Sequence, residues 1–261
     1  MILKFKARSV IKLLIVLLIV PINYLSELII HFSHGLISQS NTFNNVFLGM
    51  TFNGIYTKEE STLSTTVFGL SIPIIFNIIY GSYIYKGLQL NNIYYFVRFK
   101  NRKKWFLGSV SRLILSAVWY CLFWISFNYC LSLCNTESSI NNENLRIVSI
   151  CFLTVLSYTI ITTMAVNIFS FFVGTATAFI IVYIIIFGLF YLSLRISEIT
   201  FWGININISK FNIVDNTILT WKNELCFQDL SVNLLYIFIL IFILLLLTEN
   251  TDIGLKDKES Y

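Results

Sequence analysis

Long runs of apolar residues dominate the chain, and the charged residues are concentrated between them. A hydrocarbon core about 30 Å thick is crossed by about 20 mostly apolar helical residues. Runs of that length predict six membrane-spanning helices at about 13–32, 65–85, 113–131, 147–168, 172–194 and 232–247. The pattern therefore predicts an all-α, polytopic membrane protein with a single transmembrane domain over residues 1–261.

The fourth and fifth predicted spans come from one uninterrupted stretch. The 48 residues from 147 to 194 contain no charged residue, and as one helix they would extend about 72 Å. This is about twice what one crossing uses. We therefore predict a turn at 167–170, shortly before Gly174.

Lys and Arg residues indicate the orientation, since basic loops are retained in the cytoplasm. With the N-terminus inside, 13 of the 18 Lys and Arg residues fall in inside segments. Six spans return the chain to its starting side. Both termini are therefore predicted to be cytoplasmic.

The composition is typical of a membrane protein, and it argues against a nucleotide site or a metal site on this chain. The chain is 57% hydrophobic and 12% charged, whereas soluble domains average about 25% charged residues. None of its 11 glycines lies in a GK[ST] phosphate loop, so we expect no nucleotide site on this chain. Two His residues give little basis for a metal site, and no cofactor is expected.

Cys134 and Cys226 both fall on the predicted outer side, but their spacing does not indicate whether they pair.

The segment 86–105 is the most informative cytoplasmic stretch, because aromatic and basic residues are interleaved in its second half. This composition suits a helix at the membrane surface or against a protein partner. An ordinary basic cytoplasmic loop explains it equally well.

The predicted outer segment 195–231 is unusually apolar for a loop. It either packs on the outer mouth of the protein or forms a re-entrant hairpin shielded by the other helices. We predict a re-entrant segment before the last helix.

Several residues within the spans are candidates for a substrate path or a packing face. Polar residues in hydrocarbon face a protein interior or line a path, and interhelical hydrogen bonding is the simpler alternative. The candidates for a path are Asn23, Glu27, Asn77 and Asn128. Gly174 and Ala178 have the small-xxx-small spacing that permits close approach of another helix, including one from a second subunit.

The topology, together with residues 94–113 (YYFVRFKNRKKWFLGSVSRL), resembles the type-2 family of ABC exporter permeases. Within that family the chain is most similar to small bacterial permeases for antimicrobial or amphipathic peptides of the lantibiotic type. The resemblance implies a dimer, with a second copy or a related permease, in the bacterial cytoplasmic membrane, and it gives no role to nucleic acid. A separate cytoplasmic ATPase would bind ATP and Mg²⁺ and contact the coupling segment. The implied coupling residues are Phe96, Arg98, Phe99, Lys100, Arg102, Lys103, Lys104 and Trp105.

The predicted function is therefore a transport subunit that exports an amphipathic or antimicrobial peptide, or a lipid-like cargo, and is not itself an enzyme. One departure from the family is the short stretch before the first span, where a longer amphipathic helix is usual. A non-transporting immunity or sensor protein that binds a peptide is the main alternative. An intramembrane enzyme is the third.

Overall fold

The structure, a computed structural model, describes most of the chain after its first predicted span. The described residues are 43–52, 70–92, 102–136, 141–195, 198–201, 204–207, 210–218 and 228–250. The predicted span 13–32, with Asn23 and Glu27, lies outside them.

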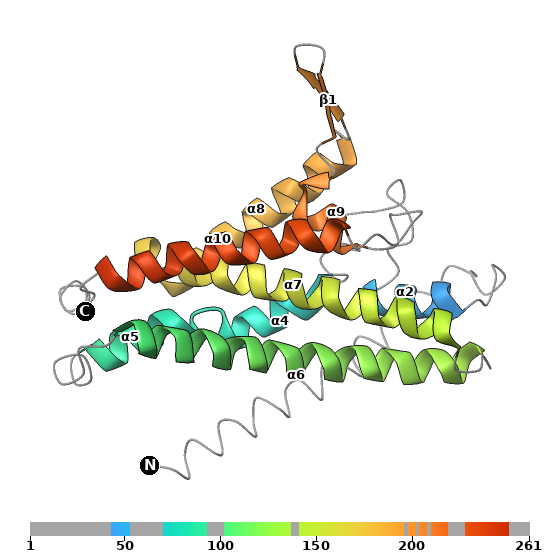
Figure 1. Ribbon diagram of the computed structural model, residues 1–261, viewed down its shortest axis with the longest axis horizontal. Helices are drawn as coiled ribbons and strands as arrows, with labels where there is room; N and C mark the ends of the chain where they lie inside the picture. The colour runs from blue at the N-terminus through green and yellow to red at the C-terminus, as the bar shows by residue number, and fades with distance from the viewer. Residues whose placement is uncertain are drawn as a thin grey trace, which may run out of the picture. The chain divides into compact units, whose positions relative to one another are not determined.

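Four long helices account for most of the described residues (Figure 1). They are α6 (Arg102–Thr136), α7 (Asn142–Val173), α8 (Thr175–Arg195) and α10 (Gln228–Asn250). Within the described part of the chain, these four are long and apolar enough to cross a membrane. The coarse prediction of an all-α membrane fold is thereby supported.

Shorter elements complete the described residues. They are α2 (Phe43–Phe52), α4 (Ser71–Tyr80), α5 (Tyr83–Asn92), α9 (Ile213–Thr217) and the strands β1 (Glu198–Phe201) and β2 (Ile204–Asn207). The two strands form an antiparallel hairpin in which Glu198 lies opposite Asn207 and Phe201 opposite Ile204.

The chain divides into two compact units. The described residues of the first are 43–52, 70–75, 122–136, 141–152 and 218. It packs through aromatic contacts, since the Phe43 ring stacks on Phe47 at 5.6 Å and meets Tyr129 edge-on at 5.7 Å. The second unit contains the described residues of 76–121, 153–217 and 226–261, and the site described below lies entirely within it.

The turn between the fourth and fifth predicted spans is real, but its predicted position is wrong. Helix α7 continues through 167–170 and ends at Val173. The chain then turns at Gly174, whose φ of +81° lies in the left-handed region that glycine adopts without a Cβ clash. Asn167 and Ser170, which the sequence predicts in the turn, are buried in the helix.

The second predicted span is not one helix. Within its described part, α4 ends at Tyr80 and α5 begins at Tyr83, with a turn at Gly81 and Ser82 between them. A Cβ on Gly81 would collide with the Asn77 carbonyl oxygen and approach Val166 at 3.2 Å. The turn therefore lies where α7 comes close to the backbone.

The third predicted span, by contrast, is longer than expected. Helix α6 has 35 residues, which correspond to about 52 Å. It begins at Arg102, so residues 102–105 of the predicted coupling segment form its first turn, and residues 86–92 lie in α5.

The outer segment between α8 and α10 contains the β-hairpin and the five-residue helix α9 in its described part. No helical hairpin is formed by those residues. The residues of α9 are all buried, so this helix packs against the protein.

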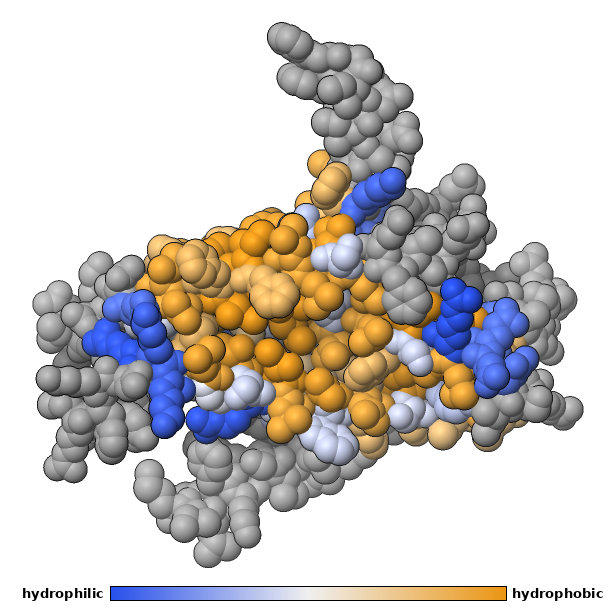
Figure 2. Space-filling view, viewed as in Figure 1, coloured by the Kyte–Doolittle hydropathy of each residue, from blue (hydrophilic) through white to orange (hydrophobic). Residues whose placement is uncertain are grey.

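The long helices differ strongly in exposure. Of the most apolar 18 residues of each helix, 72% are buried in α7, 33% in α8 and 11% in α10. Figure 2 shows hydrophobic residues along α10, with hydrophilic residues where α10 ends and α6 begins. Among these four described helices, α7 is therefore the most interior, and α10 presents the surface suited to lipid.

Substitution of Gly174 tests the turn that separates α7 from α8. Gly174→Ala should destabilise the protein by roughly 1–2 kcal/mol, because a Cβ is strained at positive φ. Gly188→Ala is the matched control, since a Cβ at either glycine meets no atom within 4 Å. The control lies inside α8 and should be neutral or stabilising by about 0.5–1 kcal/mol. Thermal unfolding midpoints in one detergent measure both changes, and equal midpoints for the two variants would contradict this role for Gly174.

Candidate functional site

A cluster of buried polar side chains lies in the second unit, centred on Asn77 of α4. The Asn77 amide nitrogen donates to the hydroxyls of Thr162 and Tyr183, each at 2.8 Å. Its Oδ1 accepts from the Thr163 hydroxyl at 2.5 Å. Asn77 is 3% exposed, so these bonds satisfy a side chain that has no access to solvent. They join α4 to α7 and α8.

Asn167 of α7 supports the start of α5 in a similar way. Its Oδ1 accepts from the backbone N–H groups of Ile84 at 3.0 Å and Tyr85 at 3.2 Å. The first N–H groups of a helix have no partner within the helix, and in hydrocarbon each must be satisfied by protein. Asn167 therefore caps α5 from a different helix.

Two further polar contacts tie α7 to the remaining long helices. Asn233 of α10 donates from Nδ2 to the Ser157 hydroxyl at 3.1 Å. The Cys121 thiol of α6 lies 3.8 Å from the Thr159 hydroxyl. Helix α7 thus makes polar side-chain contacts with α4, α5, α6 and α10, and it is linked to Tyr183 of α8 through Asn77.

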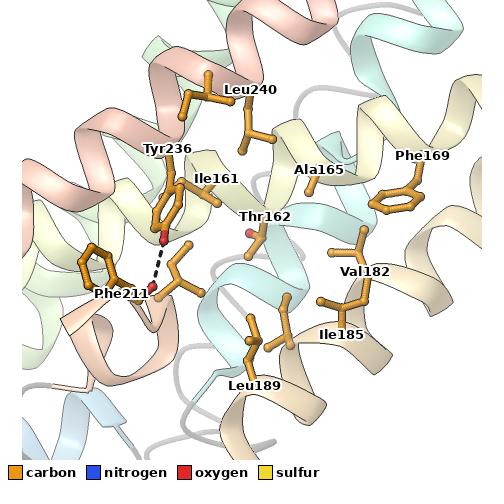
Figure 3. Close-up of a pocket in the computed structure, with 13 residues that line it drawn as sticks. Ile161, Thr162, Ala165, Phe169, Val182, Ile185, Leu189, Phe211, Tyr236 and Leu240 are labelled. Carbon is orange, nitrogen blue, oxygen red and sulfur yellow. Dashed lines mark hydrogen bonds between the residues drawn. The ribbon is translucent and has the colours of Figure 1, made fainter. Parts of the chain in front are cut away.

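Thr162 of the polar cluster also lines an apolar groove of about 340 Å³ (Figure 3). This volume is near the lower end of the roughly 300–1,000 Å³ of typical ligand sites. The lining residues come from α7, α8, α9, α10 and the turn before α9: Ile161, Thr162, Ala165, Phe169, Val182, Ile185, Ile186, Leu189, Phe211, Ile213, Tyr236, Ile239 and Leu240. The groove is thus a candidate site for an apolar ligand or for the apolar side of a larger one.

The end of the groove beside Phe211 is held by hydrogen bonds. The Tyr236 hydroxyl donates to the Phe211 carbonyl at 2.9 Å, and Figure 3 shows this bond. The Asn212 amide donates to the Leu189 carbonyl at 2.9 Å, and the Ser193 hydroxyl donates to Asp215 at 2.5 Å. These contacts fix α9 and the turn before it against α8 and α10.

The start of α6 contacts the end of α10 and the middle of α5. Lys103 Nζ lies 3.1 Å from Glu249 Oε1 near the end of α10, and Arg102 donates to the Glu249 carbonyl at 3.5 Å. A Cβ on Gly87 of α5 would lie 3.2 Å from the Trp105 ring, so the missing side chain allows this ring to rest on α5.

The structure places the predicted residues in different surroundings. Asn77 is the hub of the polar cluster, whereas Asn128 is buried in the first unit, and its Nδ2 has no hydrogen-bond partner among the described residues. Gly174 forms the turn, and Ala178 is fully buried within the chain. Of the predicted coupling residues, Arg102, Lys103, Lys104 and Trp105 form the first turn of α6. The others, Phe96, Arg98, Phe99 and Lys100, lie outside the described residues, as does Cys226.

Sequence reasoning missed several residues of the site, namely Asn167, Tyr183, Asn233 and Tyr236. Asn167 and Asn233 are amides within or beside apolar runs, which is itself a signal of a buried hydrogen-bond partner. The tyrosines carry no such signal, because tyrosine is common in apolar spans and at their ends. Among the described residues, no three His, Cys, Asp or Glu side chains lie close enough to share a metal ion.

The polar cluster can be tested through Asn77. Asn77→Leu removes the partner of three buried hydroxyl groups and should destabilise the protein by about 1–3 kcal/mol. The matched control is Asn142→Leu at an exposed position at the start of α7. Detergent unfolding midpoints should fall for the first variant only. An unchanged midpoint for Asn77→Leu would mean that the cluster contributes nothing to stability.

The cap on α5 can be tested by hydrogen exchange at the first residues of that helix. Asn167→Leu leaves the N–H groups of Ile84 and Tyr85 without their acceptor, so hydrogen exchange at the start of α5 should become faster. Ser170→Ala is the control, because the Ser170 hydroxyl bonds to the Val166 carbonyl within α7 itself. Exchange that is unchanged in the Asn167 variant, or equally fast in both variants, would contradict the capping role.

Comparison of the chain with protein-family models, curated proteins and solved structures found no match in any of the three. Its function is therefore inferred from its own residues. The features that bear on function are the apolar groove, the polar cluster beside it and the contacts of the start of α6 with α5 and α10.

Proposed function

We propose that the chain is the membrane permease subunit of an ABC exporter. It moves an amphipathic or antimicrobial peptide, or a lipid-like cargo, out of the cytoplasm or the membrane. A separate cytoplasmic ATPase binds ATP and Mg²⁺ and supplies the energy, because this chain has no phosphate-loop motif of its own.

The observation that carries the proposal is that the start of α6, beside the basic segment, contacts both α5 and the end of α10. Trp105 rests on Gly87 of α5, and Lys103 pairs with Glu249 of α10. A protein bound to the segment between α5 and α6 therefore acts on α5, α6 and α10 together. An isolated, solvated loop would not transmit such a displacement.

Helix α10 connects this end to the groove. Tyr236, Ile239 and Leu240 of α10 line the groove, and Glu249 lies 13 residues beyond Tyr236, about 20 Å along the helix. A shift of α10 driven from its end changes the groove wall. Binding of nucleotide to the partner would in this way favour one shape of the groove over another.

The full proposed topology has six spans with both termini in the cytoplasm, in a bacterial plasma membrane. Two such chains, or this chain with a related permease, make up the transporter. The segment between α8 and α10 closes the outer side, with its apolar part re-entering the membrane. The few polar groups in the groove suit a cargo with a large apolar surface.

A non-transporting immunity or sensor protein would use the groove without an ATPase. It would not require α5, α6 and α10 to be joined at the basic segment. An intramembrane enzyme, the third alternative, would require one nucleophile or acid whose loss abolishes turnover while assembly is retained.

The test is co-purification of the tagged chain in mild detergent from its source cells, followed by an ATPase assay. A nucleotide-binding subunit should be recovered with the wild-type chain and lost when Phe96, Arg98 and Trp105 are all changed to Ala. The control pair Leu145→Ala and Arg146→Ala changes exposed residues on the predicted outer side and should retain the subunit.

Two outcomes bear on the alternatives. Recovery of a folded chain without any ATPase would overturn the exporter and favour the sensor. If an ATPase is bound, Lys103→Glu should lower cargo-stimulated ATP hydrolysis, and the reversed pair Lys103→Glu with Glu249→Lys should restore it. If neither change alters ATP hydrolysis, the proposed coupling through α10 is wrong.

A further inference from the structure

The groove wall contains two hydroxyl-bearing side chains, and both use their hydrogen bonds within the protein. Thr162 donates to the Thr159 carbonyl at 3.1 Å and accepts from Asn77. Tyr236 donates to the Phe211 carbonyl at 2.9 Å. All other lining side chains are hydrocarbon. An ordered water needs two or more polar partners, and a peptide backbone has similar needs, so the wall favours a hydrocarbon occupant.

The groove opens onto the surface that suits lipid tails. Ile185 and Ile239 on its two sides are 45% and 46% exposed. Next to them on the same helices, Ile184 and Phe238 are 64% and 70% exposed. In a bilayer these side chains contact acyl chains. An acyl chain can therefore enter the groove from the side without crossing polar surface.

The charges at the Phe211 end of the groove favour an anion. Lys210 directly precedes Phe211 and is exposed, and its carbonyl accepts from the Asn216 amide at 3.0 Å. Arg195, the last residue of α8, is also exposed. Asp215, the acid whose side chain is described in this region, is buried and bonded to Ser193. Among the side chains described at this end, the exposed charges are thus positive, and they attract an anionic headgroup.

We propose that the groove is a binding site for an anionic phospholipid of the bilayer. One acyl chain lies between α7, α8 and α10, and the headgroup phosphate lies beside Lys210, with Arg195 adding to the positive field. On the predicted topology this headgroup belongs to the outer leaflet. The inference goes beyond the proposed function, because it holds for this chain whether or not an ATPase binds to it.

The test measures phospholipid retained by the full chain, purified without any ATPase from membranes that contain phosphatidylglycerol and phosphatidylcholine. Native mass spectrometry counts the lipids bound per chain. Ala165→Leu fills the groove, and Ala176→Leu makes the same change at an exposed position of α8 that does not line it. Lys210→Gln removes the cation, and Arg146→Gln is its control at an exposed position elsewhere.

Wild-type protein should retain one phosphatidylglycerol per chain in preference to phosphatidylcholine. Ala165→Leu should lower this retention about tenfold, the loss expected when about two methylene groups are no longer buried. Lys210→Gln should abolish the preference for phosphatidylglycerol while an acyl chain is still bound. Both controls should behave as wild type.

Three results would overturn the proposal: equal retention of the two lipids by the wild type, full retention by Ala165→Leu, or equal losses in Ala165→Leu and Ala176→Leu. If Ala165→Leu does not fold, Ile185→Trp at the edge of the groove takes its place with the same expected loss. A negative ATPase co-purification leaves these outcomes unchanged, so the two proposals fail independently.

Discussion

Hydrogen bonds between buried polar groups determine how α4 and α5 pack against α7 in the second unit. In hydrocarbon no water is available to a free backbone N–H or C=O group. The turn between α4 and α5 interrupts a helix and leaves such groups at the start of α5. The side chain of Asn167 satisfies two of them. The interrupted segment can therefore pack against α7, and the other helices are arranged around this contact.

Helix α7 makes polar contacts on one side and apolar contacts on another. Toward α4 it presents hydroxyls and an amide that bond with Asn77 and with the backbone of α5. Toward α8 and α10 it presents Ile161, Ala165 and Phe169, which form one wall of the groove. Thr162 takes part in the polar cluster and also lines the groove. Its hydroxyl is held by the polar cluster, and the surface left facing the groove is apolar for that reason.

Different parts of α10 contact the start of α6 and line the groove. The end of α10 at Glu249 is tied to the start of α6, where a cytoplasmic partner would bind. The middle of α10 forms the groove, where the surrounding bilayer supplies the apolar occupant. Helix α10 is bonded at Glu249 and also at Asn233 and Tyr236, near the groove. A displacement of its end would therefore reach the residues around the groove. Its exposed apolar residues, such as Phe238 and Phe242, lie on the surface suited to lipid.

The sequence by itself determined the four long apolar helices and the presence of a turn near Gly174, because the free energy of crossing a bilayer depends on hydropathy summed along consecutive residues. It also identified Asn77 as a polar residue that needs a partner. Only the tertiary structure decided that Asn167 continues α7, that the second predicted span is interrupted at Gly81 and Ser82, and that a groove lies beside Thr162. The reason is physical: the partner of a buried amide, and the shape of a surface between helices, come from residues far away in the chain.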